Sequence, residues 1–237
     1  MRGIYWAGGR GLLAGLVTVW SMVTAALPSD RRSTACSEID ADVEATEQEP
    51  VKLVCRAAKD AVATLASCGL QQTRRIVIRI AVAADDPPTD QSYGCYDHTT
   101  GLITLAGLAA CTQRLRRDES RAHIDPDEYY RSVVIHEVTH SILLAHPASD
   151  HLSRPAQEYL AYALQIDAFS DASRAEFLKP YRENRALRTL MPDEILLHMN
   201  PSAFGAMSYL HFKMLGERCD AIKRVLKGEI EFTRPYE

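Results

Sequence analysis

The sequence lacks a strong charge of either sign, closely spaced cysteines and internal repeats. Lysine and arginine number 27 against 31 aspartates and glutamates, which gives a formal net charge of −4. Because nucleic-acid-binding domains carry an excess of basic residues, this balance gives no reason to expect nucleic acid as a partner. The six cysteines form no C-x-x-C pair, which excludes the metal and redox sites built on that motif.

Long apolar stretches are also scarce, apart from one near the N-terminus. The uncharged run 11–27 follows two arginines, and its small residues Thr24 and Ala26 suit cleavage after Ala26. We therefore expect residues 1–26 to be a secretory signal. The run is just long enough to span a bilayer, so an uncleaved anchor is the alternative. The expected location is periplasmic or secreted, without stable membrane association once the signal is cleaved.

Cysteine usage agrees with export. All six cysteines lie after Ala26, and an even number in an exported chain favours disulfides, at most three. The stretch 51–68 has helical character, so Cys55 and Cys68 would lie about 20 Å apart and cannot bond each other. The other pairings stay open. We expect these bridges to hold the fold and to take no part in chemistry.

The spacing of apolar residues predicts an α+β fold in one domain at 51–237. Residues 27–50, which are acidic and poor in large apolar side chains from Ser37 on, are expected to form a flexible N-terminal segment. β-branched residues alternate along 74–83 and predict a strand, and two short extended runs within 92–105 predict a hairpin. Helices are expected at 126–146 and 154–169, followed by a helical remainder with breaks at Pro180, Pro192 and Pro201.

The most informative feature is the H-E-x-x-H pattern at residues 136–140. In a helix, residues four apart differ by about 40° in direction and about 6 Å in height. His136 and His140 can therefore place two imidazole nitrogens on one zinc ion. Glu137 points about 100° away from His136. From there it can accept a proton from a water held at the metal, as a general base does.

The flanking residues place this motif in a buried helix. Asp125 suits an N-cap, Pro126 suits the first helical position, and Pro147 follows the end of the pattern. The residues between are mostly apolar, as in a central helix. Histidines and a glutamate in such a helix need partners, because unpaired polar groups are costly there. The alternative is a core helix whose histidines are satisfied without a metal.

A catalytic zinc site needs a third protein ligand, and two candidates follow the motif. His146 lies ten residues after His136, the spacing of the metzincins, but Leu143 stands where those enzymes have a helix-breaking glycine. If the helix continues through Leu143, His146 lies about 15 Å along the axis from His136. Glu158 lies eighteen residues after His140, in the first full turn of the second helix. We favour Glu158 and keep a metzincin-like site with His146 as the alternative.

With Glu158 included, residues 126–170 resemble the zinc metallopeptidases of the gluzincin (peptidase MA-like) type, which include thermolysin-like enzymes. The resemblance implies that His136, His140 and Glu158 bind Zn²⁺ and that Glu137 is the general base. It also implies a zincin-like fold. In that fold a small antiparallel or mixed sheet packs on a buried active-site helix, and a mostly helical C-terminal half follows.

The resemblance extends to the surroundings of the ligands. In zincins an antiparallel edge strand just before the active-site helix binds the peptide, and residues 103–106 are the expected strand. Thermolysin-like enzymes orient a histidine with an aspartate four residues after the third ligand. Tyr162 stands at that position here, so the surroundings of that histidine must differ. Tyr209 and His211 lie downstream where gluzincins keep an oxyanion-stabilising residue, and an aromatic core helix is the alternative reading of them.

These patterns predict an exported zinc-dependent hydrolase, a peptidase that acts on peptides or proteins. The sequence has no G-x-M-E-N signature, so an aminopeptidase-like specificity is unsupported. The competing hypothesis is a non-catalytic zincin-fold structural or binding protein of the cell envelope. A closed site with His146 or His211 as fourth ligand would favour that second hypothesis, and an open position beside a cleft would favour the enzyme. The remaining histidines are expected at the surface or in loops: His98, His123, His151 and His198.

Overall fold

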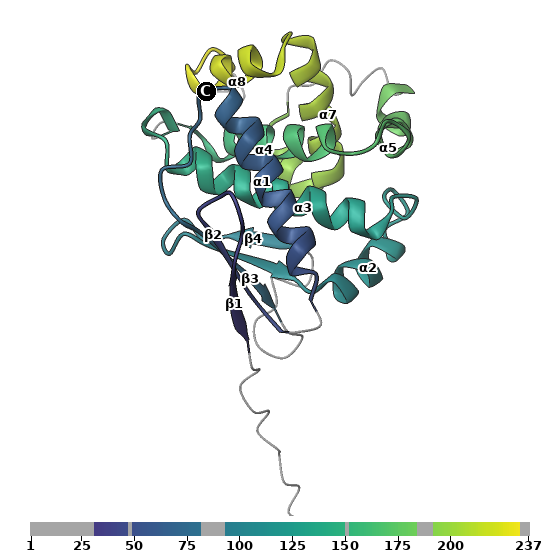
Figure 1. The fold of residues 1–237 in the computed structure, drawn as a ribbon. Coiled ribbons are helices and arrows are strands. Elements are labelled where there is room, and N and C mark those ends of the chain that lie inside the picture. The colour runs from purple at the N-terminus through teal and green to yellow at the C-terminus, as the bar shows by residue number, and fades with distance from the viewer. Residues whose placement is uncertain (1–30, 47–48, 82–92, 150–151, 184–191, 233–237) are drawn as a thin grey trace, which may run out of the picture.

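The structure is a computed structural model and describes residues 31–46, 49–81, 93–149, 152–183 and 192–232 (Figure 1). The expected secretory signal at residues 1–26 lies outside the described residues, as does His151. Within those ranges, no helix has the length and apolarity needed to cross a membrane. The chain folds as α+β, with a small mixed sheet and a mostly helical remainder, which confirms the expected fold class.

Within the described residues, five strands form one mixed sheet in the order β1-β2-β3-β5-β4. The central strands β2, β3 and β5 run parallel, while β1 and β4 pair antiparallel at the two edges. Successive side chains of a strand point to opposite faces, so Val43 and its partner Ile78 are buried on the same face. The expected strand and hairpin are present. The bounds are β1 (Arg32–Ala35), β2 (Ala41–Ala45), β3 (Ile76–Ala81), β4 (Gly94–Tyr96) and β5 (Leu102–Ala106).

The expectation of a flexible segment at residues 27–50 is wrong for the described part of that range. Strands β1 and β2 lie there, and β2 pairs with both β1 and β3. Val43 is fully buried, whereas Glu44 lies on the other face and accepts a hydrogen bond from Arg79 at 2.8 Å. The segment is acidic, yet its residues alternate as in a strand. Small apolar side chains face the core, and paired carboxylates face the opposite side of the sheet.

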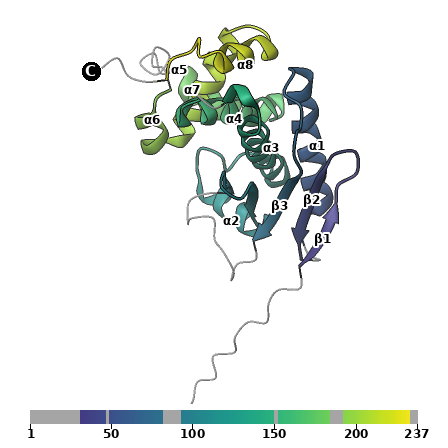
Figure 2. The same ribbon diagram turned by 90° about the vertical axis from the view of Figure 1, so that its left-hand side faces the viewer.

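Helices cover the inner face of the sheet and continue into a helical C-terminal half (Figure 2). Helix α1 contacts β2, helix α3 contacts β4 and β5, and the two helices pack against each other. Helix α4 packs against α3 and against α7. The bounds are α1 (Val51–Ser67), α2 (Leu108–Arg117), α3 (Pro126–Leu144), the 3-10 turn η1 (Pro147–Ser149), α4 (Arg154–Asp167), α5 (Asp171–Glu183), α6 (Glu194–Met199), α7 (Pro201–Met214) and α8 (Arg218–Leu226).

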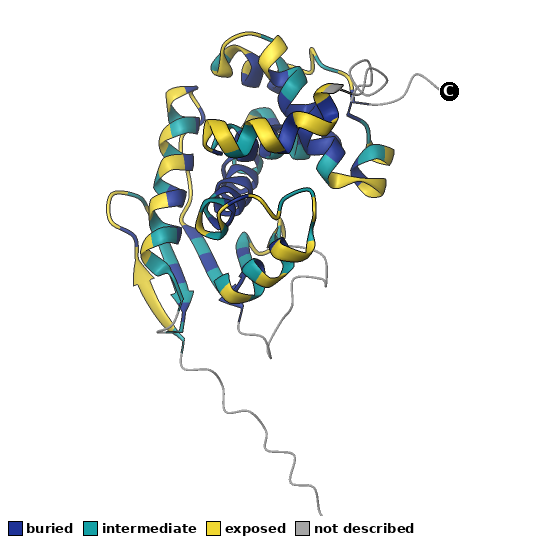
Figure 3. Ribbon diagram, turned by 90° about the vertical axis from the view of Figure 1, so that its right-hand side faces the viewer, coloured by how far each residue is buried: buried dark blue, intermediate teal, exposed yellow. Residues whose placement is uncertain are grey.

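Helix α3 is the centre of the molecule, and every residue from Ser132 to Leu143 is buried (Figure 3). Its start follows the sequence signals. The side chain of Asp125 accepts hydrogen bonds from the backbone amides of Asp127 and Glu128 at 3.0 and 3.1 Å, and Pro126 follows the cap. The expectation of a buried central helix that carries the H-E-x-x-H motif is confirmed.

One expected helix break is wrong. Pro180 lies inside α5, whereas Pro201 does begin a new helix, α7. A proline within a helix removes one backbone hydrogen bond and frees one carbonyl. Because α5 is largely exposed, water can satisfy that carbonyl, and the helix continues.

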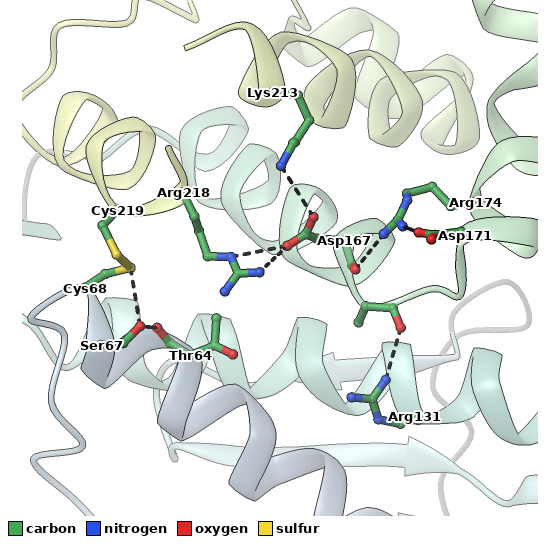
Figure 4. Close-up of polar contacts among 11 residues, drawn as sticks. Thr64, Ser67, Cys68, Arg131, Asp167, Asp171, Arg174, Lys213, Arg218 and Cys219 are labelled. Atoms are coloured by element: carbon green, nitrogen blue, oxygen red, sulfur yellow. Dashed lines mark hydrogen bonds and ion pairs between the residues drawn. A yellow bond between two sulfur atoms is a disulfide. The ribbon is translucent and has the colours of Figure 1, made fainter. Parts of the chain in front are cut away.

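Two disulfides tie distant parts of the chain together, Cys36–Cys55 and Cys68–Cys219. Cys55 and Cys68 do not bond each other, as expected. The second bridge joins the residue after α1 to the first turn of α8, beside a network of polar contacts (Figure 4). Two cysteines in the described ranges are free, Cys95 at an exposed position and Cys111 in the core.

That network holds the C-terminal end of α4 (Figure 4). Asp167 accepts a hydrogen bond from Arg218 at 2.6 Å and pairs with Lys213 at 4.0 Å. Arg131 of α3 donates to the carbonyl of Ala168 at 3.0 Å. Cations are favourable at a helix C-terminus because they meet its unpaired carbonyls and the negative end of its dipole. These contacts fix α4 relative to α3, the two helices that carry the candidate site.

Candidate metal centre

Three side chains from α3 and α4 converge at one point. The chain turns through η1 and brings α4 back against α3. His136 and His140 lie one turn apart on the same face of α3, and each residue is 7% exposed. Ser153 caps α4 by accepting a hydrogen bond from the amide of Ala156 at 3.4 Å. That start places Glu158 in the early turns of α4, facing the two histidines.

The donor atoms of these side chains have the spacing of a metal site. Nε2 of His136 lies 3.2 Å from Nε2 of His140. Oε2 of Glu158 lies 3.4 Å from the first of these nitrogens and 3.7 Å from the second. Ligand atoms at about 2.0–2.2 Å from a tetrahedral metal lie roughly 3.3–3.6 Å from one another. The group can therefore hold a metal ion without rearrangement.

His146 does not join this group. Helix α3 continues through Leu143 to Leu144, as the sequence predicts for a leucine in place of a glycine. Nδ1 of His146 instead accepts a hydrogen bond from the backbone amide of Ala148 at 3.2 Å. Among the described residues, the group that can hold a metal consists of His136, His140 and Glu158.

Glu137 lies in a tight space under strand β4. The residue is 6% exposed, and a Cβ atom added to Gly94 would lie 2.8 Å from its Oε1. Any larger residue at position 94 would displace the carboxylate from its present position. Burial raises the pKa of Glu137, while His136, His140 and the backbone amide of Tyr96 act in the opposite direction. A carboxylate with a raised pKa is a better proton acceptor near neutral pH.

The Glu158 carboxylate interacts with both histidines. Burial disfavours the charged form of Glu158, but hydrogen bonds with His136 and His140 outweigh it and hold the pKa of Glu158 well below its usual range. Burial likewise lowers the pKa of His136, yet the contacts with Glu158 and Glu137 raise it above its ordinary value. A bound cation would favour the deprotonated forms of these side chains, because metal ligands must be deprotonated.

Gln165 orients the first histidine, and the sequence analysis missed it. Oε1 of Gln165 lies 3.0 Å from Nδ1 of His136, so Nδ1–H donates to the amide and Nε2 is left free for the cluster. Nε2 of Gln165 donates in turn to the hydroxyl of Ser132 at 3.4 Å. The ring of Tyr162 packs edge-on against His136, with 4.6 Å between the ring centres. Gln165 lies seven residues, or two helical turns, after Glu158, a spacing that places both on one face of α4.

Strand β4 covers the second histidine. The ring of Tyr96 lies parallel to that of His140, with 6.5 Å between centres and 11° between planes. Arg74, just before β3, donates to the Tyr96 hydroxyl, and its guanidinium lies 5.7 Å from the ring centre. The sheet edge therefore fixes the positions of both Glu137 and His140.

A cavity of about 870 Å³ opens beside the three candidate ligands. Its volume lies in the range of small-molecule and substrate sites. Residues of β4, α3 and α4 line it, and so does His98 in the hairpin turn, which was expected at the surface and is exposed. The cluster is therefore open on one side instead of closed by a fourth side chain from the described residues.

Tyr209 and His211 lie away from this cavity. Nδ1 of His211 is 2.8 Å from the hydroxyl of Tyr159, and Tyr209 is buried with the guanidinium of Arg174 5.9 Å from its ring centre. Neither lines the cavity. These contacts favour the alternative reading, in which both belong to an aromatic core helix, α7.

The strand expected to bind the substrate, residues 103–106, is not the edge strand of the sheet. Residues 103–106 belong to β5, which lies inside the sheet between β3 and β4. The antiparallel edge strand is β4, the first arm of the hairpin. The hairpin itself was predicted, but which arm pairs with β3 depends on contacts between distant residues, and the sequence pattern does not contain them.

A comparison with known proteins identifies the family to which this chain belongs. Residues 41–235 match the family model described as "Family of unknown function (DUF6639)". The chain belongs to the DUF6639 family. The match begins with β2 and contains all of the candidate ligands, so the candidate metal centre lies inside the part typical of DUF6639. No curated protein matches the chain, and no solved structure does.

The disulfides of this DUF6639 chain are compatible with an exported protein, because such bonds form and persist in oxidising compartments. Both bridges lie far from the three candidate ligands in the sequence. Neither Cys36 nor any other paired cysteine is available as a ligand.

Proposed function

We propose that this chain is an exported zinc-dependent hydrolase that cleaves peptide bonds, with His136, His140 and Glu158 as the metal ligands and Glu137 as the general base. The observation that carries the proposal is the convergence of the three donor atoms within 3.7 Å of one another at the wall of an 870 Å³ cavity. The gluzincin-like order of these residues along the chain supports the same reading.

The donor set favours zinc among the common metals. Two imidazole nitrogens and one carboxylate oxygen form a ligand set of catalytic zinc sites, whereas magnesium and calcium prefer oxygen ligands. The hydrogen bond from His136 to Gln165 supports this assignment, because zinc-binding histidines commonly donate their other ring N–H to an acceptor.

The chain's own residues supply the proton transfers. Zinc, when bound, supplies a Lewis acid that lowers the pKa of water and polarises a carbonyl group. The Glu137 carboxylate takes a proton from the attacking water and passes it to the leaving nitrogen. Burial raises the pKa of this carboxyl group, which strengthens it as a proton acceptor. The amide of Tyr96 and the space at Gly94 hold the carboxylate in place.

Among the described residues, no strand pairs with the outer edge of β4, and this edge supports an extended peptide as substrate. The backbone bonds Ala106 N–H to Tyr93 C=O and Asp97 N–H to Leu102 C=O place these residues in the hydrogen-bonded pairs of the β4–β5 hairpin. Because hydrogen-bonded pairs alternate, the backbone groups of Gly94 and Tyr96 point away from β5. The amide of Tyr96 bonds to Glu137, which leaves the backbone of Gly94 and the carbonyl of Tyr96 for a peptide. A peptide can pair with that edge as an added strand, as in zincins, and pass over the cavity.

A non-catalytic zincin-fold protein of the cell envelope is the competing proposal. A closed site with a fourth protein ligand would favour it. The two candidates for a fourth ligand contact other residues instead: His146 contacts the amide of Ala148, and His211 contacts the hydroxyl of Tyr159. The open cavity therefore supports the hydrolase.

Metal content and activity test the proposal together. Purified protein should contain one zinc per chain by elemental analysis. Glu158→Ala and His140→Ala should lose it, and His146→Ala, the matched histidine control, should keep it. Glu137→Gln should keep zinc and lose nearly all hydrolysis of a fluorogenic peptide mixture. Retained activity in Glu137→Gln would refute the mechanism, and wild-type protein that binds no zinc would refute the proposed function.

A further inference from the structure

The cavity contains an aromatic pocket that extends from the metal centre along α3. Val133 and Tyr129 lie three and seven residues before His136, on the same face of the helix, and both line the cavity. Tyr93, just before β4, also lines it, and its ring contacts that of Tyr129 edge-on with 4.8 Å between centres. The aromatic pocket therefore adjoins His136, one of the three candidate ligands.

Arg121 brings a positive charge to this pocket. It comes from the loop between α2 and α3, lines the cavity, and has a side chain that is 14% exposed. Its guanidinium lies 5.9 Å from the ring centre of Tyr93 and 5.8 Å from that of Tyr129. Nη1 donates to Asp118 at 2.8 Å, and Nη2 donates to the hydroxyl of Ser202 at 2.6 Å.

These contacts leave hydrogen-bonding capacity on Arg121. A guanidinium has five N–H donors, and among the described residues its partners are Asp118, Ser202 and the hydroxyl of Tyr93. Arg121 meets Asp118 through one nitrogen, Nη1. The side chain of Asp118 is 28% exposed, and its carboxylate also accepts hydrogen bonds from the amide and hydroxyl of Ser120. A ligand carboxylate that entered the pocket would meet a largely desolvated cation.

We propose that Arg121 makes this site selective for a substrate carboxylate beside the cleaved bond. The inference rests on the proposed peptidase function. The carboxylate can belong to the side chain of a flanking aspartate or glutamate or to the C-terminus of the peptide. The rings of Tyr93 and Tyr129 would enclose the apolar stem of that residue, while Arg121 binds its charged end.

Matched peptides distinguish these sources. One peptide series carries glutamate or glutamine at each position that flanks the cleaved bond, and every member is made with an amidated and with a free C-terminus. The zinc-loaded protein should cleave the better glutamate peptide with a kcat/KM about tenfold higher than its glutamine partner. A preference for the free over the amidated C-terminus would instead identify the terminal carboxylate.

Two variants test whether Arg121 is responsible. Arg121→Met should bring the glutamate-to-glutamine ratio close to one, whereas Asp118→Asn, which removes the competing carboxylate, should raise the ratio. Both variants lose the Arg121–Asp118 ion pair, so a purely structural role would affect both alike and leave the ratio unchanged. If Arg121→Met does not fold, Arg121→Lys and Asp118→Asn still give opposite predictions, because lysine cannot offer the planar guanidinium fork.

The outcomes separate the inference from the proposed function. Equal cleavage of glutamate and glutamine peptides, and of free and amidated peptides, would overturn carboxylate selection while the peptidase stands. Failure of the zinc-loaded wild type to cleave any peptide would overturn the peptidase and the inference with it.

Discussion

Replacing Gly94 with alanine should separate the general base from the metal. The added Cβ would lie 2.8 Å from Oε1 and 2.9 Å from Cγ of Glu137, whereas ordinary contacts lie at 3.4–4 Å. The Glu137 side chain must therefore move by about 0.5–1 Å, a range set by the difference between these distances. None of the three candidate ligands is touched, so zinc should stay bound.

We expect Gly94→Ala to lower kcat and to leave the stability of the fold unchanged. Displacement of a catalytic group by about 1 Å lowers the rate on the order of 10²-fold. The obstructing atoms belong to a flexible side chain, so the backbone of β4 can keep its place. Alanine also loses less conformational entropy than glycine on folding, worth roughly 0.5–1 kcal/mol. Gly94→Ala should therefore show an unchanged or slightly higher Tm, one zinc per chain, and kcat reduced about a hundredfold.

The double variant provides the control. In the Glu137→Gln background the base is already gone, so adding Gly94→Ala should reduce kcat little further, and the two effects should be strongly non-additive. Steady-state kinetics on one fluorogenic peptide, with zinc content measured on the same samples, give both numbers. Full activity of Gly94→Ala with zinc bound would refute the role of this contact. Additive losses would show that the clash acts on something other than Glu137.

The remaining predictions concern the surroundings of the site and the disulfides. Gln165→Leu should weaken zinc binding by about 10–100-fold in competition with a chelator, and unchanged affinity would show that His136 needs no oriented partner. A maleimide should label exposed Cys95 in the native protein. It should label buried Cys111, whose pKa burial raises to about 12, only after unfolding, and native labelling of Cys111 would contradict the packing. The Cys68–Cys219 bridge spans 151 residues, whereas the Cys36–Cys55 bridge spans 19. In chemical denaturation, Cys68→Ser should therefore lower the free energy of unfolding by about 5 kcal/mol and Cys36→Ser by about 3 kcal/mol. The reverse order would refute the chain-entropy argument.

The parts of the site that were predictable are those encoded within one or two neighbouring helices. The Asp125 cap, the His136–His140 spacing and the Glu158 position all lie within residues 125–158, and each acts through local helical geometry. Their convergence needed only the short turn between α3 and α4. Local geometry of this kind survives most variation in tertiary packing.

The parts that were missed depend on contacts between distant segments. The order of β4 and β5 in the sheet is not fixed by their own residues, and so the roles of Gly94 and Tyr96 could not be derived. The acidic composition of residues 27–50 favours a flexible segment, whereas the alternating burial of β2 shows a strand. The apolar positions of β2 are mostly alanines, whose burial depends on the close approach of helix α1. Arg121 reaches the cavity from a loop, where no periodicity predicts direction.

The partner of His136 shows how the site balances charge in a buried setting. With a divalent cation, two neutral imidazoles, the Glu158 carboxylate and the nearby Glu137 carboxylate, the charges cancel. An aspartate in the position where thermolysin-like enzymes have one would add a further negative charge to this buried cluster, and uncompensated buried charge is costly. Gln165 orients the imidazole through a neutral amide, and the ring of Tyr162 packs edge-on against the same histidine. A neutral partner for His136 therefore avoids a further buried charge beside Glu137 and Glu158.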